Sequence, residues 1–445
     1  MHSYTTPDIS LLDFFYQALT DHGIAYCILR NADEVEQGCA HDVDMTIDAA
    51  FLEKAEQLLH AIAEQKGWKK HLQTGSSADP VNIKCYHYYQ ADIDLQQIHI
   101  LHIDIFPTFT WKGRVLLNNK TLLTRITGNG LYRKAAEETE AVCNLFVRLL
   151  FNGYIKEKYK KNIKRVFVTK TREVFELMLQ FLPQALVADI NHWVHQEEWH
   201  KIERERKRII IGIQRTAPHH RMLYFRYILG KALCRKGMVV AFLGTDGSGK
   251  SSIINELPNI IGRTFSGDTI NYYHWRPGFI KTEKRLDADV NEFSNVSPHT
   301  RKSYCSLISL AKMSMYVLDY MLGYWFRIRW QAAKGHLVVF DRYYYDFYMD
   351  KARYRLNIGN WIIRLLHLFI PKPDITFVLL GDAEKIHARK NELPLEEVQR
   401  QIDLLRANKR LFASPVVVDV CRSIPEVVYT VSSNILKKLS GQKLG

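Results

Sequence analysis

The sequence predicts an α/β protein with three parts: an α+β domain, a helical segment, and a C-terminal half built on a doubly wound parallel sheet. From Met238 onward, short apolar runs alternate with helical stretches, and this β-α-β order is typical of parallel sheets. Residues 131–236 have mostly helical periodicity and many cations, whereas residues 1–130 mix helix-like and strand-like runs. We therefore expect domain boundaries that give 1–130, 131–236 and 237–445.

Composition indicates a folded protein of two or three domains, because 445 residues exceed one ordinary core and 47% of them are hydrophobic. The seven cysteines are scattered and form no C-x-x-C pair, which excludes a disulfide framework and a zinc site. The start, MHSYTTPDIS, has no secretion-signal pattern, and no uncharged apolar run reaches the ~18 residues of a membrane span. We expect a cytoplasmic protein.

The formal charge of +14 is unevenly distributed, with net values of −6, +11 and +9 over residues 1–150, 151–236 and 237–445. Eight cations and one acid fall between Lys156 and Arg172. Such a segment favours an anionic partner, so we expect docking on an anionic membrane surface, at its inner face, more than on nucleic acid. The aromatic-aliphatic stretches 316–326 and 361–370 would assist this docking. The alternative is that the basic segment is an ordinary solvated helix face.

The first domain reads as alternating helices and strands with three carboxylates placed to converge. Asp42 and Asp44 lie two apart on an alternating run and share one face, and Asp104 lies on a later strand. Three such carboxylates are the ligand set of a two-metal site, although Asp92 and Asp94 form a competing pair. The expected helices are 11–19 and 51–66, and the expected strands are 24–30, 42–47, 81–89 and 98–106.

The clearest motif joins the strand 239–243 to a helical stretch through Gly244-Thr245-Asp246-Gly247-Ser248-Gly249-Lys250-Ser251. This G-x-x-x-x-G-K-S loop, with Ser252 after it, presents backbone N–H groups and a helix N-terminus to an anion. Lys250 is expected to reach the β- and γ-phosphates of ATP, and Ser251 to hold Mg²⁺. A glycine-rich turn that matches by chance is the alternative.

A second motif ends the apolar run 337–340 with Asp341-Arg342-Tyr343. A carboxylate at a strand end beside a phosphate loop is well placed to hold Mg²⁺, and the adjacent arginine can fork onto an acceptor phosphate. We expect Asp341 and Arg342 to be catalytic, and Arg342 and Tyr343 to bind the acceptor. An ordinary strand end with an ion pair is the alternative.

Two further stretches offer cations to the same site. Residues 382–406, after the expected strand 375–380, carry Arg389 and Lys390, with the charged residues Glu392, Glu397 and Arg400 beyond them. Arg389 on such a flap would neutralise charge in the transition state. Arg276, in INYYHWRPG, is a second acceptor-anchoring candidate. A solvated charged helix and a surface turn are the respective alternatives.

These motifs resemble the thymidylate kinase-like branch of P-loop kinases, as found among bacterial surface-polysaccharide enzymes, over residues 238–445. The resemblance implies ATP and Mg²⁺ at the loop, with roles for Lys250, Ser251, Asp341, Arg342 and Arg389. Residues 20–110 resemble the DNA polymerase beta-like nucleotidyltransferases through Asp42, Asp44 and Asp104. Arg30 and Asn31 stand where that family has a glycine pair, which favours a relic domain that recognises the acceptor.

We therefore expect a kinase that transfers the γ-phosphate of ATP to a nucleotide, sugar phosphate or glycan acceptor in surface-polysaccharide synthesis. One alternative is a kinase and nucleotidyltransferase that processes nucleic-acid ends, with the basic segment on the polynucleotide. Another is an ATP-gated binding module at a membrane surface. The sequence leaves the oligomeric state open, and a dimer is compatible with it.

Overall fold

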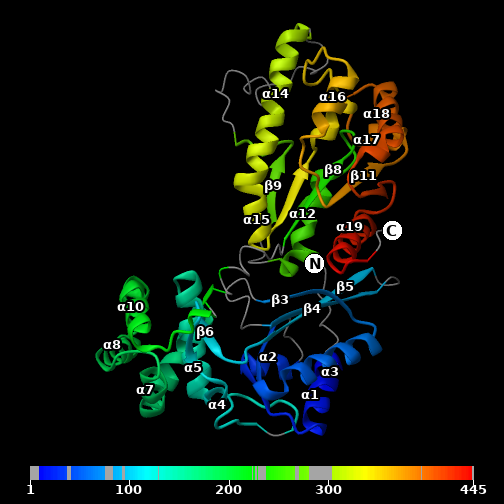
Figure 1. Cartoon of the computed structure of the whole chain (residues 1–445). Coiled ribbons are helices and arrows are strands. Elements are labelled where there is room, and N and C mark those ends of the chain that lie inside the picture. Colours follow the sequence, from blue (N-terminus) through cyan, green and yellow to red (C-terminus); the bar gives the residue numbers. More distant parts are fainter. Residues whose placement is uncertain are drawn as a thin grey trace. The chain divides into compact units, whose positions relative to one another are not determined.

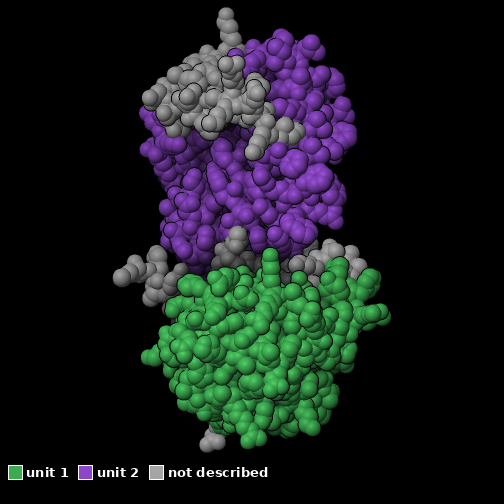
Figure 2. Space-filling view, turned by 90° about the vertical axis from the view of Figure 1, so that its left-hand side faces the viewer, with its two compact units in different colours: residues 1–90, 99–234 green, residues 91–98, 235–445 purple. Residues whose placement is uncertain are grey.

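The computed structural model divides the chain into two compact units, residues 1–90 with 99–234, and residues 91–98 with 235–445 (Figure 2). Asp94 and Glu392 lie outside the described residues. The structure describes residues 10–37, 42–75, 84–92, 96–128, 130–222, 224, 225, 228, 237–265, 270–279, 303–391 and 393–442.

Unit 1 contains a five-stranded sheet in the order β1-β2-β5-β4-β3. Strand β2 pairs antiparallel with β1 and parallel with β5, which places Asp44 opposite Asp104. Helices α1 (Ser10–Asp21) and α3 (Leu52–Gln65) pack against each other (Figure 1). The strands are β1 (Tyr26–Arg30), β2 (Asp42–Ile47), β3 (Lys69–Gly75), β4 (Lys84–Asp92) and β5 (Gln97–Ile105).

Strand β1 shows how this sheet is buried on both faces. Its side chains alternate, so Tyr26 and Ile28 join the core that contains α1 and α3, whereas Cys27 and Leu29 join a second core. That second core is formed with a helical layer: α5 (Glu137–Asn152), α6 (Glu157–Thr169), α7 (Thr171–Leu179), α8 (Gln184–His195), α9 (Trp199–Arg204) and α10 (Arg206–Thr216). Unit 1 also includes α2 (Ala32–Glu36), α4 (Asn119–Leu122) and the hairpin β6 (Phe109–Trp111) and β7 (Arg114–Leu117).

Unit 2 contains a parallel five-stranded sheet in the order β12-β11-β8-β10-β9. The chain adds strands on both sides of β8, and with right-handed crossovers this order puts helices on both faces. Because all strands are parallel, their carboxyl ends lie at one edge of the sheet. The strands are β8 (Met238–Leu243), β9 (Ile270–His274), β10 (Leu337–Asp341), β11 (Ile375–Leu380) and β12 (Pro415–Asp419).

The helices of unit 2 include a long segment between β9 and β10 and a pair, α12 and α19, that pack against each other (Figure 1). The long segment consists of α14, the π-helical turn η5 and α15. None of the described helices has the length and apolar character needed to cross a bilayer. The bounds are α12 (Lys250–Ile261), α14 (Ser306–Gly323), η5 (Tyr324–Ile328), α15 (Arg329–Ala333), α16 (Asn360–His367), α17 (Ala383–Arg389), α18 (Leu395–Asn408) and α19 (Ile424–Leu439).

Candidate functional site

The glycine-rich loop lies between β8 and α12, and its glycines are required by the local geometry. Gly247 has a φ of 87°, and a Cβ atom there would stand 2.7 Å from the carbonyl oxygen of Ile386 in α17. Gly249 also has a positive φ, of 82°, but a Cβ there would meet nothing within 4 Å. The loop is therefore packed against α17 at Gly247 and open at Gly249, just before the N-terminus of α12.

Lys250 is buried, and its ammonium lies over the loop that precedes it. Its Nζ donates to the carbonyl oxygens of Gly244 at 2.8 Å and Thr245 at 2.9 Å. Burial, with Arg342 nearby, lowers the pKa of Lys250 to about 8. Ser248 is buried below the ammonium, whereas Ser251 and Ser252 are exposed in the first turn of α12.

Asp341 is the last residue of β10, the strand that lies between β8 and β9 in the sheet. Its Oδ2 accepts from the Tyr272 hydroxyl at 3.1 Å and lies 3.7 Å from Nδ1 of His274. Its Oδ1 is buried with no hydrogen-bond partner among the described residues. Burial alone would raise the pKa of Asp341, but His274, Lys250 and Arg342 outweigh it and hold the pKa below its ordinary value. Asp341 is thus a carboxylate with one unsatisfied oxygen, which suits a cation ligand.

Arg342 is buried and is held from two sides by carboxylates. It pairs with Asp246 of the loop, and its Nη1 lies 3.1 Å from Oδ2 of Asp346. Arg353 pairs with the second oxygen of Asp246 at 3.1 Å, and the Tyr354 hydroxyl donates to Asp346 at 2.6 Å. Arg342 and Arg353 outweigh burial and hold the pKa of Asp246 well below its ordinary value. Arg342 therefore ties the loop to the end of β10.

The backbone at Arg342 has a φ of 71°, in the left-handed region that non-glycine residues rarely adopt. Such strain persists only where the surroundings hold it, and here two ion pairs do so. Asp246 was expected only as a loop residue, and Asp346 and Arg353 were not expected at all. The spacing of Asp346, four residues after Arg342, was a signal that the sequence contained.

The other expected acceptor residues have partners of their own. Arg276 is nearly buried, lies 3.5 Å from the buried carboxylate of Asp319, and its guanidinium faces the rings of Trp275 and Tyr316. Tyr343 lies in the aromatic core, where its hydroxyl donates to the carbonyl of Pro371 at 2.6 Å. The Tyr343 hydroxyl is thus already committed inside the core, so we do not assign it to the acceptor.

The flap residues contact different parts of unit 2: the phosphate loop, the residue after β12, and Met349. Arg389, the last residue of α17, is exposed and donates through Nη1 to the carbonyl of Val420 at 2.9 Å. Lys390 follows it, and its Cβ lies 3.2 Å from the position that a Cβ on Gly247 would occupy. Arg400 pairs with Glu397 and donates to the carbonyl of Met349 at 3.2 Å. Lys390 is thus a flap cation whose side chain begins beside the phosphate loop.

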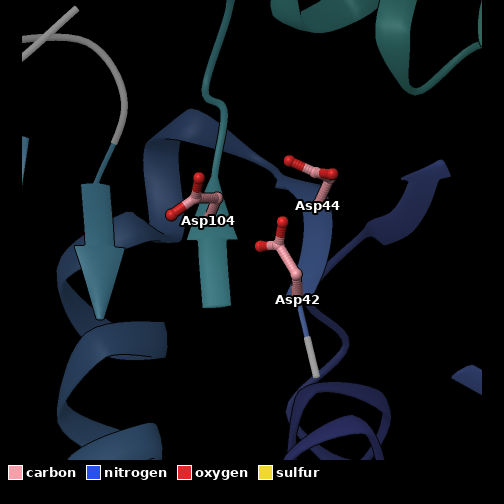
Figure 3. A group of neighbouring side chains, drawn as sticks. All are labelled: Asp42, Asp44 and Asp104. Atoms are coloured by element: carbon pink, nitrogen blue, oxygen red, sulfur yellow. The ribbon is translucent and has the colours of Figure 1, made fainter. Parts of the chain in front are cut away.

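A second cluster lies in unit 1, where Asp42 and Asp44 of β2 and Asp104 of β5 point toward one another (Figure 3). One carboxylate oxygen from each lies within 4.8 Å of the others. Burial, reinforced by Asp44, raises the pKa of Asp42 to about 6, and burial with Asp42 and Asp44 raises that of Asp104 to about 8. Three carboxylates this close favour a divalent cation between them.

Of the two residues that stand where a glycine pair was expected, Arg30 takes part in this cluster. Arg30 is buried, and its Nη2 lies 2.5 Å from Oδ2 of Asp44. Asn31 adopts a left-handed conformation with a φ of 57°, and its side-chain oxygen accepts from the Tyr159 hydroxyl at 3.2 Å. Arg30 therefore neutralises one of the three carboxylates from within the protein.

The helical layer adds two cations near this cluster: Arg148, which was not expected at a site, and Lys156, which was expected only in the basic segment. Arg148 and Lys156 both act on the carboxyl of Asp42 by lowering its pKa against burial. Burial, with Arg148, lowers the pKa of Lys156. A carboxylate cluster flanked by cations is the arrangement that holds a metal together with a polyphosphate.

No protein-family model matches the chain, and no curated protein matches it. Among solved structures, the chain is similar to the thymidylate kinase from Ehrlichia chaffeensis, with a TM-score of 0.31 and 16% sequence identity. The match covers 45% of this chain and 98% of that chain.

Proposed function

We propose that unit 2 is a phosphotransferase that moves the γ-phosphate of ATP to an acceptor, with Mg²⁺ as the metal. The observation that carries the proposal is the pairing of the phosphate loop after β8 with the unsatisfied Oδ1 of Asp341 at the end of β10. Adjacent parallel strands bring both features to one edge of the sheet, where open α/β sheets bind ligands.

The loop residues would bind the phosphates, and two side chains would hold the metal. Backbone N–H groups from Gly247 to Ser251 and the α12 N-terminus suit the β-phosphate, and Lys250 would leave the loop carbonyls for the phosphate oxygens. Ser251 and Asp341 are the proposed metal ligands. Held by these two side chains, Mg²⁺ would supply positive charge against the phosphates of ATP. The chain's part is positioning and charge stabilisation.

Arg342 and the flap would complete the site. We assign to Arg342 a positioning role toward Asp246 and, through any N–H group that the two carboxylates leave available, contact with an acceptor phosphate. Arg389 and Lys390 would approach the transferred group if the flap moves toward the loop. A nucleotide, a sugar phosphate and a glycan are the acceptor classes to be tested.

The test is transfer of radiolabel from [γ-³²P]ATP to panels of nucleoside monophosphates, sugar phosphates, lipid-linked glycans and oligonucleotides. Lys250→Ala should abolish transfer and leave the fold intact, whereas Lys409→Ala, an exposed lysine of the same unit, should have no effect. Equal rates for the wild type and Lys250→Ala would overturn the proposal. Arg342→Ala should raise the KM for the acceptor, and an unchanged KM would remove its acceptor role.

We also propose that the three aspartates of unit 1 bind a divalent cation, either for nucleotidyl transfer or as a relic that recognises the acceptor. Their close approach supports metal binding, and the ion pair of Arg30 with Asp44 favours the relic. Calorimetry of the full chain with Mn²⁺ and each nucleoside triphosphate, compared between Lys250→Ala and Asp42→Asn/Lys250→Ala, separates the cases. Nucleotide binding lost with Asp42 supports transfer, and altered acceptor affinity alone supports the relic.

A further inference from the structure

Helix α14 and its continuation η5 and α15 have an unusual surface, because large apolar side chains are exposed along their length. Leu307 is 78% exposed, Phe326 67% and Trp330 59%. The opposite side is buried in the aromatic core through Tyr316 and Tyr320. The π-helical turn η5 interrupts the regular helix at the point where consecutive aromatic residues face outward. The exposed large apolar residues of this segment are Leu307, Ile308, Leu310, Leu318, Leu322, Trp325, Phe326 and Trp330.

A neighbouring helix continues this exposed apolar character. Helix α16 packs against α14, and the two lie side by side in Figure 1. Trp361 is 69% exposed and Leu368, directly after α16, is 79% exposed, with Leu365 and Phe369 also exposed. We call the exposed apolar residues of α14, η5, α15 and α16, together with Leu368 and Phe369, the apolar face.

Along residues 303–372, the described stretch that carries the apolar face, the exposed charges have one sign. Between Ser303 and Lys372 the sequence has four acidic residues, and all four are buried: Asp319, Asp341, Asp346 and Asp350. Arg329, Lys334 and Arg364 are exposed. The exposed formal charges of this stretch are therefore all positive.

Two of these cations stand beside exposed indole rings. The Arg329 guanidinium lies 4.5 Å from the ring centre of Trp325, and Nζ of Lys334 lies 5.5 Å from that of Trp330. Indole rings favour the boundary between lipid headgroups and acyl chains, where long cationic side chains reach the phosphates. Each cation–indole pair could therefore place a ring at that boundary and a cation beside the lipid phosphates.

We propose that the apolar face docks on an anionic lipid surface, with α14 lying in the plane of the headgroups. Apolar side chains would enter the acyl boundary, and Arg329, Lys334 and Arg364 would meet lipid phosphates. An isologous contact between two copies would instead bring together two surfaces whose exposed charges, among residues 303–372, are all positive. Charge therefore favours the lipid surface over a second copy.

The basic segment 156–172 is a weaker candidate for the same surface, because most of its cations already have carboxylate partners. Lys158 pairs with Glu34 at 3.0 Å, and Arg165 pairs with Glu137 at 3.3 Å. Lys160 pairs with Glu157, and Lys164 pairs with Glu197. The apolar face has exposed cations beside a large exposed apolar area, and the basic segment exposes less apolar area.

The test is co-sedimentation of the full chain with vesicles of phosphatidylcholine alone or mixed with phosphatidylserine. We expect binding to the mixed vesicles, weakened by salt, and quenching of tryptophan fluorescence by brominated phosphatidylcholine in them. Arg329→Gln/Lys334→Gln/Arg364→Gln should weaken binding about 100-fold, at about fivefold per cation. Trp325→Gln/Trp330→Gln should reduce both binding and quenching.

Matched controls keep the outcome interpretable. Phe51→Gln and Lys161→Gln replace exposed residues of unit 1 and should leave vesicle binding unchanged. Every variant is checked by circular dichroism and by ATP binding without lipid, so that a folding defect is distinguished from lost docking. Absence of binding to the mixed vesicles at low salt would overturn the proposal, as would an unaffected Trp325→Gln/Trp330→Gln protein. A wild-type dimer that this double variant dissociates, without vesicle binding, would assign the face to a second copy instead.

Discussion

Replacing Asp341 by asparagine tests whether this carboxylate acts as a metal ligand or only as a structural ion-pair partner. The substitution keeps the volume of the side chain, and an amide oxygen can still accept from the Tyr272 hydroxyl that now lies 3.1 Å away. The position of the unsatisfied Oδ1 is then taken by an amide nitrogen, which donates and cannot bind a cation. The change therefore removes the proposed metal contact while it leaves the packing in place.

The expected magnitudes differ for activity and for stability. Loss of one charge-stabilising contact in a transition state lowers the rate about 10²–10³-fold. The free energy of unfolding should change by no more than about 1 kcal/mol, because two effects of similar size oppose each other. The variant loses attraction to Lys250 and Arg342, and it also loses a buried carboxylate oxygen that has no partner among the described residues.

The assay is γ-phosphate transfer over a range of Mg²⁺ concentrations, together with urea unfolding. Asp382→Asn is the matched control, because Asp382 follows β11 at the same edge and caps α17, a role that asparagine also fills. The reasoning is refuted if Asp341→Asn keeps the wild-type rate and Mg²⁺ dependence. A large loss of stability would show that Asp341 acts mainly as a structural ion-pair partner.

Three further predictions concern other parts of the chain. Gly247→Ala should destabilise unit 2 by about 2 kcal/mol more than Gly249→Ala in urea, because only the former adds a Cβ against a backbone oxygen; equal losses would contradict this. Burial lowers the pKa of His367 to about 4, so the neutral imidazole contributes to the stability of the fold above pH 6.5. Acidification to pH 5 should lower the free energy of unfolding by about 1–2 kcal/mol, a figure that allows for solvent screening. His367→Gln should flatten that part of the pH profile of unfolding, and an unchanged profile would count against it. Arg30→Ala leaves the buried carboxylate of Asp44 without its cation, so the free energy of unfolding should fall by about 3 kcal/mol. Added Mn²⁺ should restore that stability, and no recovery with Mn²⁺ would argue against the metal site.

Local sequence was sufficient for most strands near the two candidate sites. Strands β2 and β11 begin and end where the alternating run 42–47 and the apolar run 375–380 predicted them. Strand β9 was missed, because INYYH is an edge strand with alternating partly exposed side chains and lacks an apolar run. The phosphate loop could be located from its letters alone, since its chemistry depends on consecutive residues.

The arrangement of Arg342 could not be read from the sequence. Its partner Asp246 lies 96 residues earlier, and Arg353 reaches the same carboxylate over 107 residues. These ion pairs exist because β8 and β10 are neighbours in register, which places the loop beside the end of β10. Asp44 and Asp104 likewise meet only because β2 pairs with β5. Local sequence thus determined most of the strands near the sites and the place of the phosphate loop, whereas tertiary structure decided which charged side chains meet, because strand order and register are set by packing between distant segments.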